Sequence, residues 1–218
     1  MRKIDKTQIL ATAYQSWIKQ LKGQTHPKYS SSHKYYKDVL LSLLYCQQGL
    51  CAYTEILIAE EERCSPENFD KEGKYIDRGK PESSFSAQLD HFNSHLKEKY
   101  GWCWDNFLAI SDKINIEKGR QTVDSILKPD SPEYDPHKLL GYNEKRHVFH
   151  AHPDIEDENL QIRIENMILV LGLNQGTIKD NRRAYLEPKK KSLINGKEIE
   201  PVYQFFTAFE MIKEKTVF

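Results

Sequence analysis

Four side chains in residues 89–119 are of types that could together hydrolyse a phosphodiester. Asp90 and His91 are adjacent, Asn106 follows after fourteen residues, and Asn115 follows after eight more. A histidine near its unperturbed pKa can take a proton from water. One carboxylate and one amide oxygen suit Mg²⁺, which keeps most of its waters and also takes phosphate oxygens. The set therefore predicts His91 as a general base, with Asp90 and Asn115 as ligands of Mg²⁺ or Mn²⁺.

A strand–loop–strand–helix arrangement would position these groups. The stretch 85–92 is short and extended and ends near Asp90 and His91, and 104–111 is extended again and includes Asn106. Residues 112–121 are predicted to be helical, with Ser111 or Asp112 as the N-cap. If this helix leans across the hairpin, Asn115 faces Asp90. The Asn106 amide is then expected to bond loop backbone and to orient His91.

Each of these residues alone also has an ordinary structural explanation. A DH dipeptide is common, and His91 by itself fits a surface or core histidine. Asn106 could form an Asx turn, and Asn115 could be a solvated helix residue. The joint pattern, in its strand and helix context, is what favours chemistry.

The remaining elements predict an α+β fold that is mainly helical. Apolar residues at helical spacing predict helices within 9–23, 33–47, 160–171, 175–187 and 202–214, and alternation predicts a strand over 147–152. Residues 50–58 are expected to be extended, and the polar residues 59–84 to form a surface excursion. We expect one domain over 1–218, with N-terminal helices in 1–48, a β-containing centre in 49–120 and a helical part in 121–218.

Composition and charge exclude some classes of protein. The 218 residues are 39% hydrophobic and 29% charged, and contain no apolar run of membrane-spanning length and no secretory signal, so a cytoplasmic protein without a membrane is expected. The 32 basic and 32 acidic residues balance, but basic residues gather in 1–40 and 178–197. Such runs are either solvated surface or phosphate contacts.

Further candidates for substrate contact lie near and beyond the central segment. His95 follows His91 by four residues, and Lys118 follows Asn115 by one helical turn; Arg182 and Arg183 belong to the second basic run. All four are predicted nucleic-acid contacts, with solvated side chains as the alternative. His150 and His152 share a strand face and could bind a metal, but with no carboxylate partner in view they are interpreted as structural or solvated.

The segment 89–119 resembles the core of HNH (ββα-metal) endonucleases, and DNFLAISDKIN is similar to the second half of the HNH domain of CRISPR effector nucleases. More of the chain resembles the HNH subunit of Septu-type antiphage systems (PtuB-like), which also occurs beside some retrons. The motifs that carry this likeness are MRKID, GLCAYTE, LDHF, WDNF, and LGLN followed by Arg182 and Arg183.

This resemblance implies a metal-dependent endonuclease that acts as the effector of a prokaryotic antiphage defence system. It also implies a partner ATPase of the ABC/SMC-like kind, since this chain has no Walker A motif. DNA is the favoured substrate, and a structured RNA such as tRNA stays open. The alternative is a degenerate HNH scaffold that binds its partner or nucleic acid without cutting.

The chain departs from the PtuB-like pattern at the zinc knuckles. Members of that group carry two CxxC pairs, whereas here only Cys51 remains, and Thr54, Ser111 and Ile114 occupy the other three positions. One cysteine cannot hold a structural zinc, so none is expected. Packing of aromatic and apolar residues is expected to hold this junction instead. Loss of the zinc ligands is the feature that favours the non-catalytic alternative.

Overall fold

The computed structural model describes residues 1–216, which form an α+β structure with two antiparallel two-stranded sheets. Contacts divide the chain into two compact units. The N-terminal unit comprises residues 4–52 and 57–123, and the C-terminal unit comprises residues 1–3, 53–56 and those from 124 onward. The predicted boundary at residue 121 lies close to this division, but the two short segments were not foreseen. That the chain forms a single domain stays a prediction.

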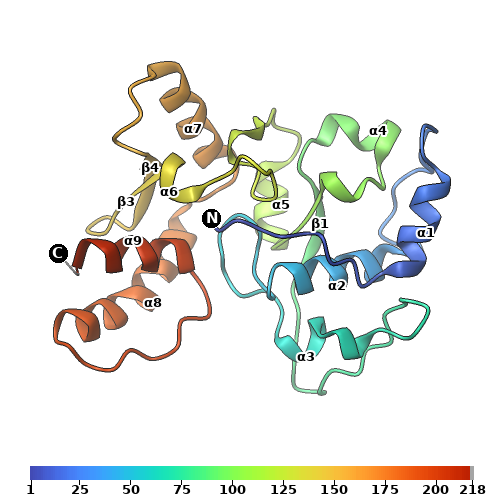
Figure 1. Ribbon diagram of the computed structural model, residues 1–218, viewed down its shortest axis with the longest axis horizontal. Coiled ribbons are helices and arrows are strands. Elements are labelled where there is room, and N and C mark those ends of the chain that lie inside the picture. Colours follow the sequence, from blue (N-terminus) through green and yellow to red (C-terminus); the bar gives the residue numbers. More distant parts are fainter. Residues whose placement is uncertain (217–218) are drawn as a thin grey trace. The chain divides into compact units, whose positions relative to one another are not determined.

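A hairpin followed by a helix forms the centre of the N-terminal unit. Strand β1 (Gln88–His91) pairs antiparallel with β2 (Phe107–Ile110), so that His91 lies opposite Phe107. Helix α5 (Asp112–Lys118) follows β2 and packs against β1, and Ser111 Oγ accepts from its Ile114 N–H at 3.5 Å (Figure 1). The predicted order of elements is therefore confirmed. Asn106, however, ends a 3₁₀ turn (Trp104–Asn106) and does not open the strand.

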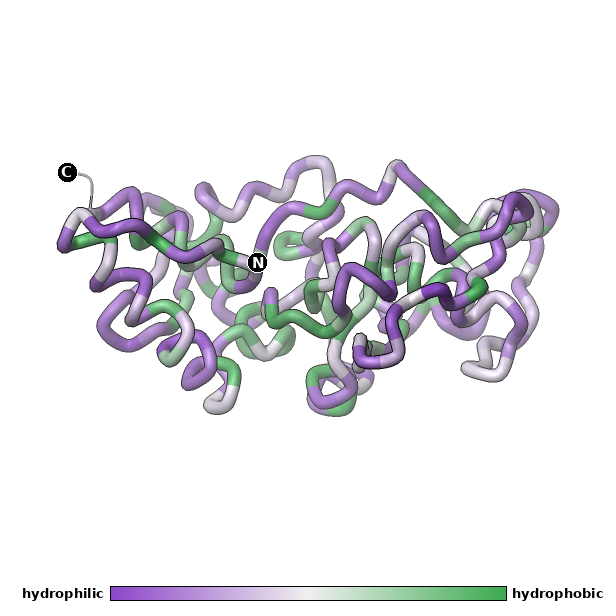
Figure 2. The backbone as a smooth tube through the Cα atoms, turned by 90° about the horizontal axis from the view of Figure 1, so that it is seen from below, coloured by the Kyte–Doolittle hydropathy of each residue, from purple (hydrophilic) through white to green (hydrophobic). Residues whose placement is uncertain are grey.

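Two helices contribute to the apolar core around this hairpin and its connecting loop. Helix α2 (Tyr36–Cys46) packs on β2, and all four residues of β2 are buried. Helix α1 (Thr12–Gln20) contributes Tyr14, whose hydroxyl donates to the Trp102 carbonyl at 2.6 Å. Hydrophilic and hydrophobic residues are interspersed along the backbone (Figure 2), as expected of elements that bury one face.

A buried glutamine supports β2 from the α2 side. The Gln47 side chain accepts from the Ala109 N–H at 2.9 Å and donates to the Ala109 and Leu50 carbonyls, each at 2.7 Å. The Ala52 N–H adds a bond to the same Ala109 carbonyl at 3.1 Å. The strand edge that β1 does not cover is thus hydrogen-bonded. These hydrogen bonds of Gln47, the Gln47 tether, supplement the packing expected from the sequence. The absence of a structural zinc stays a prediction.

The structure corrects one expectation for residues 50–84 and adds detail to another. Residues 50–58 do not form a strand: they turn, Leu50 and Leu57 meet in a single bridge, and Glu55 has a φ of 58°. The polar excursion contains a short helix, α3 (Glu61–Cys64), and is tied down. Asn68, only 2% exposed, donates to the Glu62 carbonyl at 2.6 Å and accepts from Arg78 N–H at 3.0 Å. Interior hydrogen bonds therefore hold a segment whose composition is that of open surface.

The C-terminal unit combines a second hairpin with helices. Helix α6 (Pro136–Leu139) leads into β3 (Leu140–Asn143), which pairs antiparallel with β4 (Val148–Ala151). Three longer helices follow: α7 (Glu158–Val170), α8 (Gly176–Ile194) and α9 (Phe206–Thr216). The predicted strand and three helices are all present, but α8 runs past Pro188 and α9 begins four residues late. Over residues 1–216, the structure contains no helix with the length and apolarity that a membrane span requires.

Candidate active site

A cavity of about 490 Å³ in the N-terminal unit gathers four of the predicted site residues: Asp90, His91, His95 and Asn115. They come from the end of β1, the loop after it and α5. The structure thus brings these four together within one unit. The other residues that line the cavity are Tyr29, Ser31, Tyr36, Gln88, Leu89, Ser94, Lys97, Glu98, Gly119 and Arg120.

His91 is held at the cavity in a defined orientation. Its Nε2 lies 2.9 Å from the Gly101 carbonyl oxygen, and its ring contacts the rings of Tyr29 and Phe107 at centroid distances of 4.5 and 4.8 Å. Since a carbonyl oxygen only accepts, Nε2 carries the proton of the neutral ring and Nδ1 carries the lone pair. Burial lowers the pKa of His91, and the Gly101 carbonyl opposes part of that shift. His91 is therefore neutral near pH 7, as a general base must be.

Asn106 fixes the loop between the two strands. Its side-chain oxygen accepts from the Asn93 N–H at 2.9 Å, and its amide donates to the Asn93 carbonyl at 3.0 Å. Both bonds go to the backbone of Asn93, two positions after His91, so they fix the start of the loop. Asn106 is 5% exposed. These are the backbone contacts expected of this amide, whereas its effect on catalysis stays a prediction.

Lys118 of α5 contacts Asp90. Its Nζ lies 3.1 Å from Asp90 Oδ1 and donates to the His91 carbonyl at 2.9 Å. Lys118 is 1% exposed and Asp90 4%. The prediction that Lys118 reaches a substrate phosphate is corrected: a buried ammonium with two partners has no open surface for one. The lysine instead fastens α5 to the end of β1.

Asn115 is turned toward Gln88 on β1. Its Nδ2 donates to Gln88 Oε1 at 2.9 Å, and that Asn115 faces Asp90 stays a prediction. Gln88 precedes Asp90 by two residues and therefore lies on the same strand face. Asn115, Gln88 and Asp90 still line one cavity.

The oxygen donors of this cavity suit a hard divalent cation. Asp90 offers a carboxylate, and Asn115 and Gln88 offer amide oxygens, the ligand types that Mg²⁺ and Mn²⁺ take alongside water. Within residues 1–216 no group of three or more His, Cys, Asp and Glu side chains could hold a metal ion. A site built on one carboxylate and amides would have to rely on water and substrate oxygens for its remaining positions.

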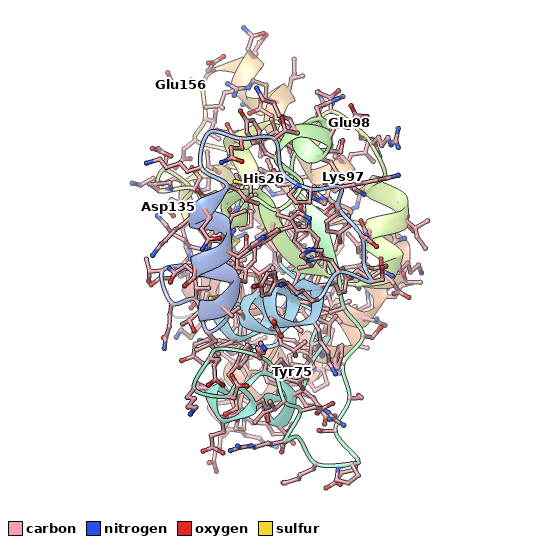
Figure 3. All side chains as sticks on the ribbon, turned by 90° about the vertical axis from the view of Figure 1, so that its right-hand side faces the viewer. His26, Tyr75, Lys97, Glu98, Asp135 and Glu156 are labelled. Carbon is pink, nitrogen blue, oxygen red and sulfur yellow. The ribbon has the colours of Figure 1, made fainter. Side chains whose placement is uncertain are left out.

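Sequence reasoning missed several residues of this cavity. Lys97, at the start of α4 (Lys97–Tyr100), and its neighbour Glu98 are exposed on the wall (Figure 3), and Lys97 Nζ lies 4.7 Å from the centroid of the Tyr29 ring. Tyr29 is more than sixty positions from His91, and no local signal reveals that contact. Exposed Arg120, two residues after Lys118, could have been found as a cation just past the helix end.

The two arginines of the predicted basic run have opposite surroundings in α8. Arg182 is 1% exposed and donates to the carbonyls of His147, at 3.0 Å, and Leu173. Its guanidinium also lies 4.7 Å from the Phe149 ring centroid. The prediction that Arg182 binds nucleic acid is corrected by this burial. Arg183 is exposed, and its role as a phosphate contact stays a prediction.

Comparison with known proteins adds no assignment: no protein-family model matches this chain, and no curated protein matches it.

Proposed function

We propose that this chain is a metal-dependent HNH (ββα-metal) endonuclease that hydrolyses phosphodiester bonds of nucleic acid. One observation carries the proposal: a neutral, oriented histidine and a carboxylate stand together at the end of β1, and an amide-bearing helix lines the same cavity. The sequence resemblance to HNH nucleases points to the same residues. DNA is the favoured substrate, and structured RNA is the alternative.

His91 would take the proton of the attacking water on Nδ1, because Nε2 is committed to the Gly101 carbonyl. Asn106 would hold the loop start in place and keep the ring orientation. Asp90, Asn115 and Gln88 would hold the divalent metal. When bound, such a cation stabilises the negative charge that develops on the phosphate and the leaving oxygen.

The exposed cations of the cavity wall would position the substrate. Lys97 and Arg120 are exposed there, and His95 lies in the loop beside them. Their positive charges suit the phosphates on either side of the scissile bond. We assign to Lys97 and Arg120 the contact that the sequence had suggested for Lys118.

The broader setting rests on the sequence resemblance alone. We propose that the protein is an effector of an antiphage defence system of the Septu or retron type, acting with an ABC/SMC-like ATPase. Co-purification of the two from cells that express both tests this setting, and a lone chain that cleaves at the full rate of the pair would contradict a need for the ATPase.

A cleavage assay tests the activity. Purified protein, with and without the ATPase, is incubated with plasmid DNA and with total RNA in Mg²⁺ or Mn²⁺. We expect cleavage that EDTA abolishes, and that Asp90→Ala and Asn115→Ala weaken. Partial rescue of Asn115→Ala by extra metal is expected, since one neutral ligand is lost among several waters. Activity that survives EDTA would refute the metal-dependent mechanism.

One observation favours a non-catalytic scaffold as the second candidate. Lys118 already compensates the charge of Asp90, as it would in a protein that no longer binds metal. Nucleic-acid binding without cleavage in either metal, with the ATPase present, would favour this candidate.

A further inference from the structure

The charges around the cavity do not favour a free divalent cation. Two acids line it, Asp90 and Glu98, and two exposed cations line it as well, Lys97 and Arg120. Buried Lys118 adds a third cation directly behind Asp90. Together these five side chains carry one net positive charge. A dication entering this cavity alone meets no net attraction.

The Lys118–Asp90 ion pair is the main reason why the charges around the cavity disfavour a free divalent cation. The ammonium lies 3.1 Å from Asp90 Oδ1, so a cation held by that carboxylate would also lie near the ammonium and be repelled by it. This repulsion would offset part of the attraction of the carboxylate for the cation. Solvent screening is weak, because both side chains are at most 5% exposed. The carboxylate is thus present but electrostatically compensated.

A nucleic-acid phosphate would neutralise this net positive charge. A phosphodiester seated between Lys97 and Arg120 would add negative charge to the same cavity, together with oxygen ligands that a divalent cation prefers. The cation and the nucleic acid would then each raise the affinity of the other, since such coupling is reciprocal.

We infer that Lys118 is the residue that couples the two ligands: by compensating Asp90 it keeps divalent-metal affinity low until a nucleic-acid phosphate occupies the cavity. The inference rests on the proposed function. Lys118 is a positioning residue, because it contacts Asp90 and the His91 backbone and is too buried to touch substrate. Its consequence is an order of assembly, with nucleic acid before metal.

Mn²⁺ binding measured by calorimetry tests this without relying on cleavage. The titrations use the His91→Ala background, with and without a short DNA duplex, and repeat the second arm with structured RNA. Lys118→Gln removes the charge but keeps a donor for Asp90 and the His91 carbonyl. Lys113→Gln, an exposed lysine of the same helix, is the matched control. The same titrations with Asp90→Asn added to the background subtract metal bound by nucleic acid alone.

Without nucleic acid, Lys118→Gln should bind Mn²⁺ about 5- to 150-fold more tightly than the background protein, and Lys113→Gln should not differ from it. Nucleic acid should tighten Mn²⁺ binding by a similar factor when Lys118 is present, and much less in Lys118→Gln. Equal or weaker Mn²⁺ binding by folded Lys118→Gln overturns the inference. If that variant does not fold, the protein with Lys118 decides: no tightening by nucleic acid also overturns it.

The outcome is separable from that of the proposed function. Coupled Mn²⁺ binding in a protein whose wild type never cleaves would leave this inference standing and refute the nuclease assignment. Cleavage with uncoupled metal binding would do the opposite.

Discussion

Lys118 in the N-terminal unit and Arg182 in the C-terminal unit were assigned the same role from sequence, and both are buried at 1% exposure. Their partners differ. Lys118 meets a carboxylate, that of Asp90, which lines a cavity. Arg182 meets two backbone carbonyls and is surrounded by aromatic rings, including that of Phe149. We propose that the buried cation beside a cavity carboxylate bears on chemistry, whereas the one that satisfies carbonyls supports the fold.

The burial of both cations was readable from helical spacing. Lys118 follows buried Ile114 by four residues, and Arg182 lies between buried Ile178 and Leu186 at the same spacing. Residues four apart share a helix face. A basic residue in an apolar stripe is therefore an interior group, and the charge of its neighbours along the chain is a poor guide to its role.

The same contrast applies to two histidines. Burial lowers the pKa of both His91 and His147. His91 contacts one carbonyl and lines the cavity. His147, with a φ of 55°, bridges the Tyr142 hydroxyl and Glu187, both at 2.9 Å. We interpret His91 as a candidate general base and His147 as a structural residue.

The prediction with the largest expected effect tests this difference between His91 and His147. His91→Ala should reduce the single-turnover cleavage rate by about 10²–10⁴-fold, because the water loses its general base. His147→Ala should lower the free energy of unfolding and leave the cleavage rate of the folded protein near that of the wild type. Single-turnover assays and urea unfolding on both variants make the comparison. Near-normal cleavage by His91→Ala would remove His91 from the mechanism.

The second prediction concerns stability in the C-terminal unit. Arg182→Met should lower the free energy of unfolding by about 2–6 kcal/mol, since it leaves two buried carbonyls without donors at about 1–3 kcal/mol each. Arg183→Met, at the exposed neighbour, should change it by less than about 0.5 kcal/mol. Urea midpoints at constant m-value provide the measurement. Equal losses in the two variants would contradict the distinction between buried and exposed arginine.

Local pattern predicted the order of elements but not their rotation or distant contacts. The β1–β2–α5 sequence and the Asn106 bonds depend on short-range spacing, which alternation and capping reveal. The partners of Asn115 and Lys118 on β1 depend on how α5 is rotated against the strand, and the order of elements does not set that rotation. The Gln47 tether joins positions 62 residues apart, and no sequence periodicity encodes that contact.

A third prediction follows from the pKa of His91. Because burial lowers that pKa below its ordinary value of about 6.5, the basic form persists to lower pH. The acid limb of kcat/KM should therefore have its midpoint below pH 6.5, with the rate falling about tenfold per pH unit beneath it. A pH series with a folding control checks this. A midpoint above 6.5 would show that a different group, or a charged His91, governs activity.

The prediction with the smallest expected effect distinguishes surface cations from buried ones by the salt dependence of nucleic-acid binding. Each phosphate contact releases condensed counterions, so removing one should make the slope of log K against log salt shallower by about 0.9 for duplex DNA. Exposed Arg120 and Arg183 are the proposed contacts, and buried Lys118 is not. Arg120→Gln and Arg183→Gln should each flatten the slope and weaken binding more at low salt than at high salt. Lys118→Gln should leave the slope unchanged when binding is measured in EDTA, where metal coupling cannot contribute. A flattened slope for Lys118→Gln in a folded protein would mean that Lys118 leaves Asp90 and contacts a phosphate when nucleic acid binds. Lys118 and Arg182 would then differ because the Lys118 side chain can move, and not because their partners differ.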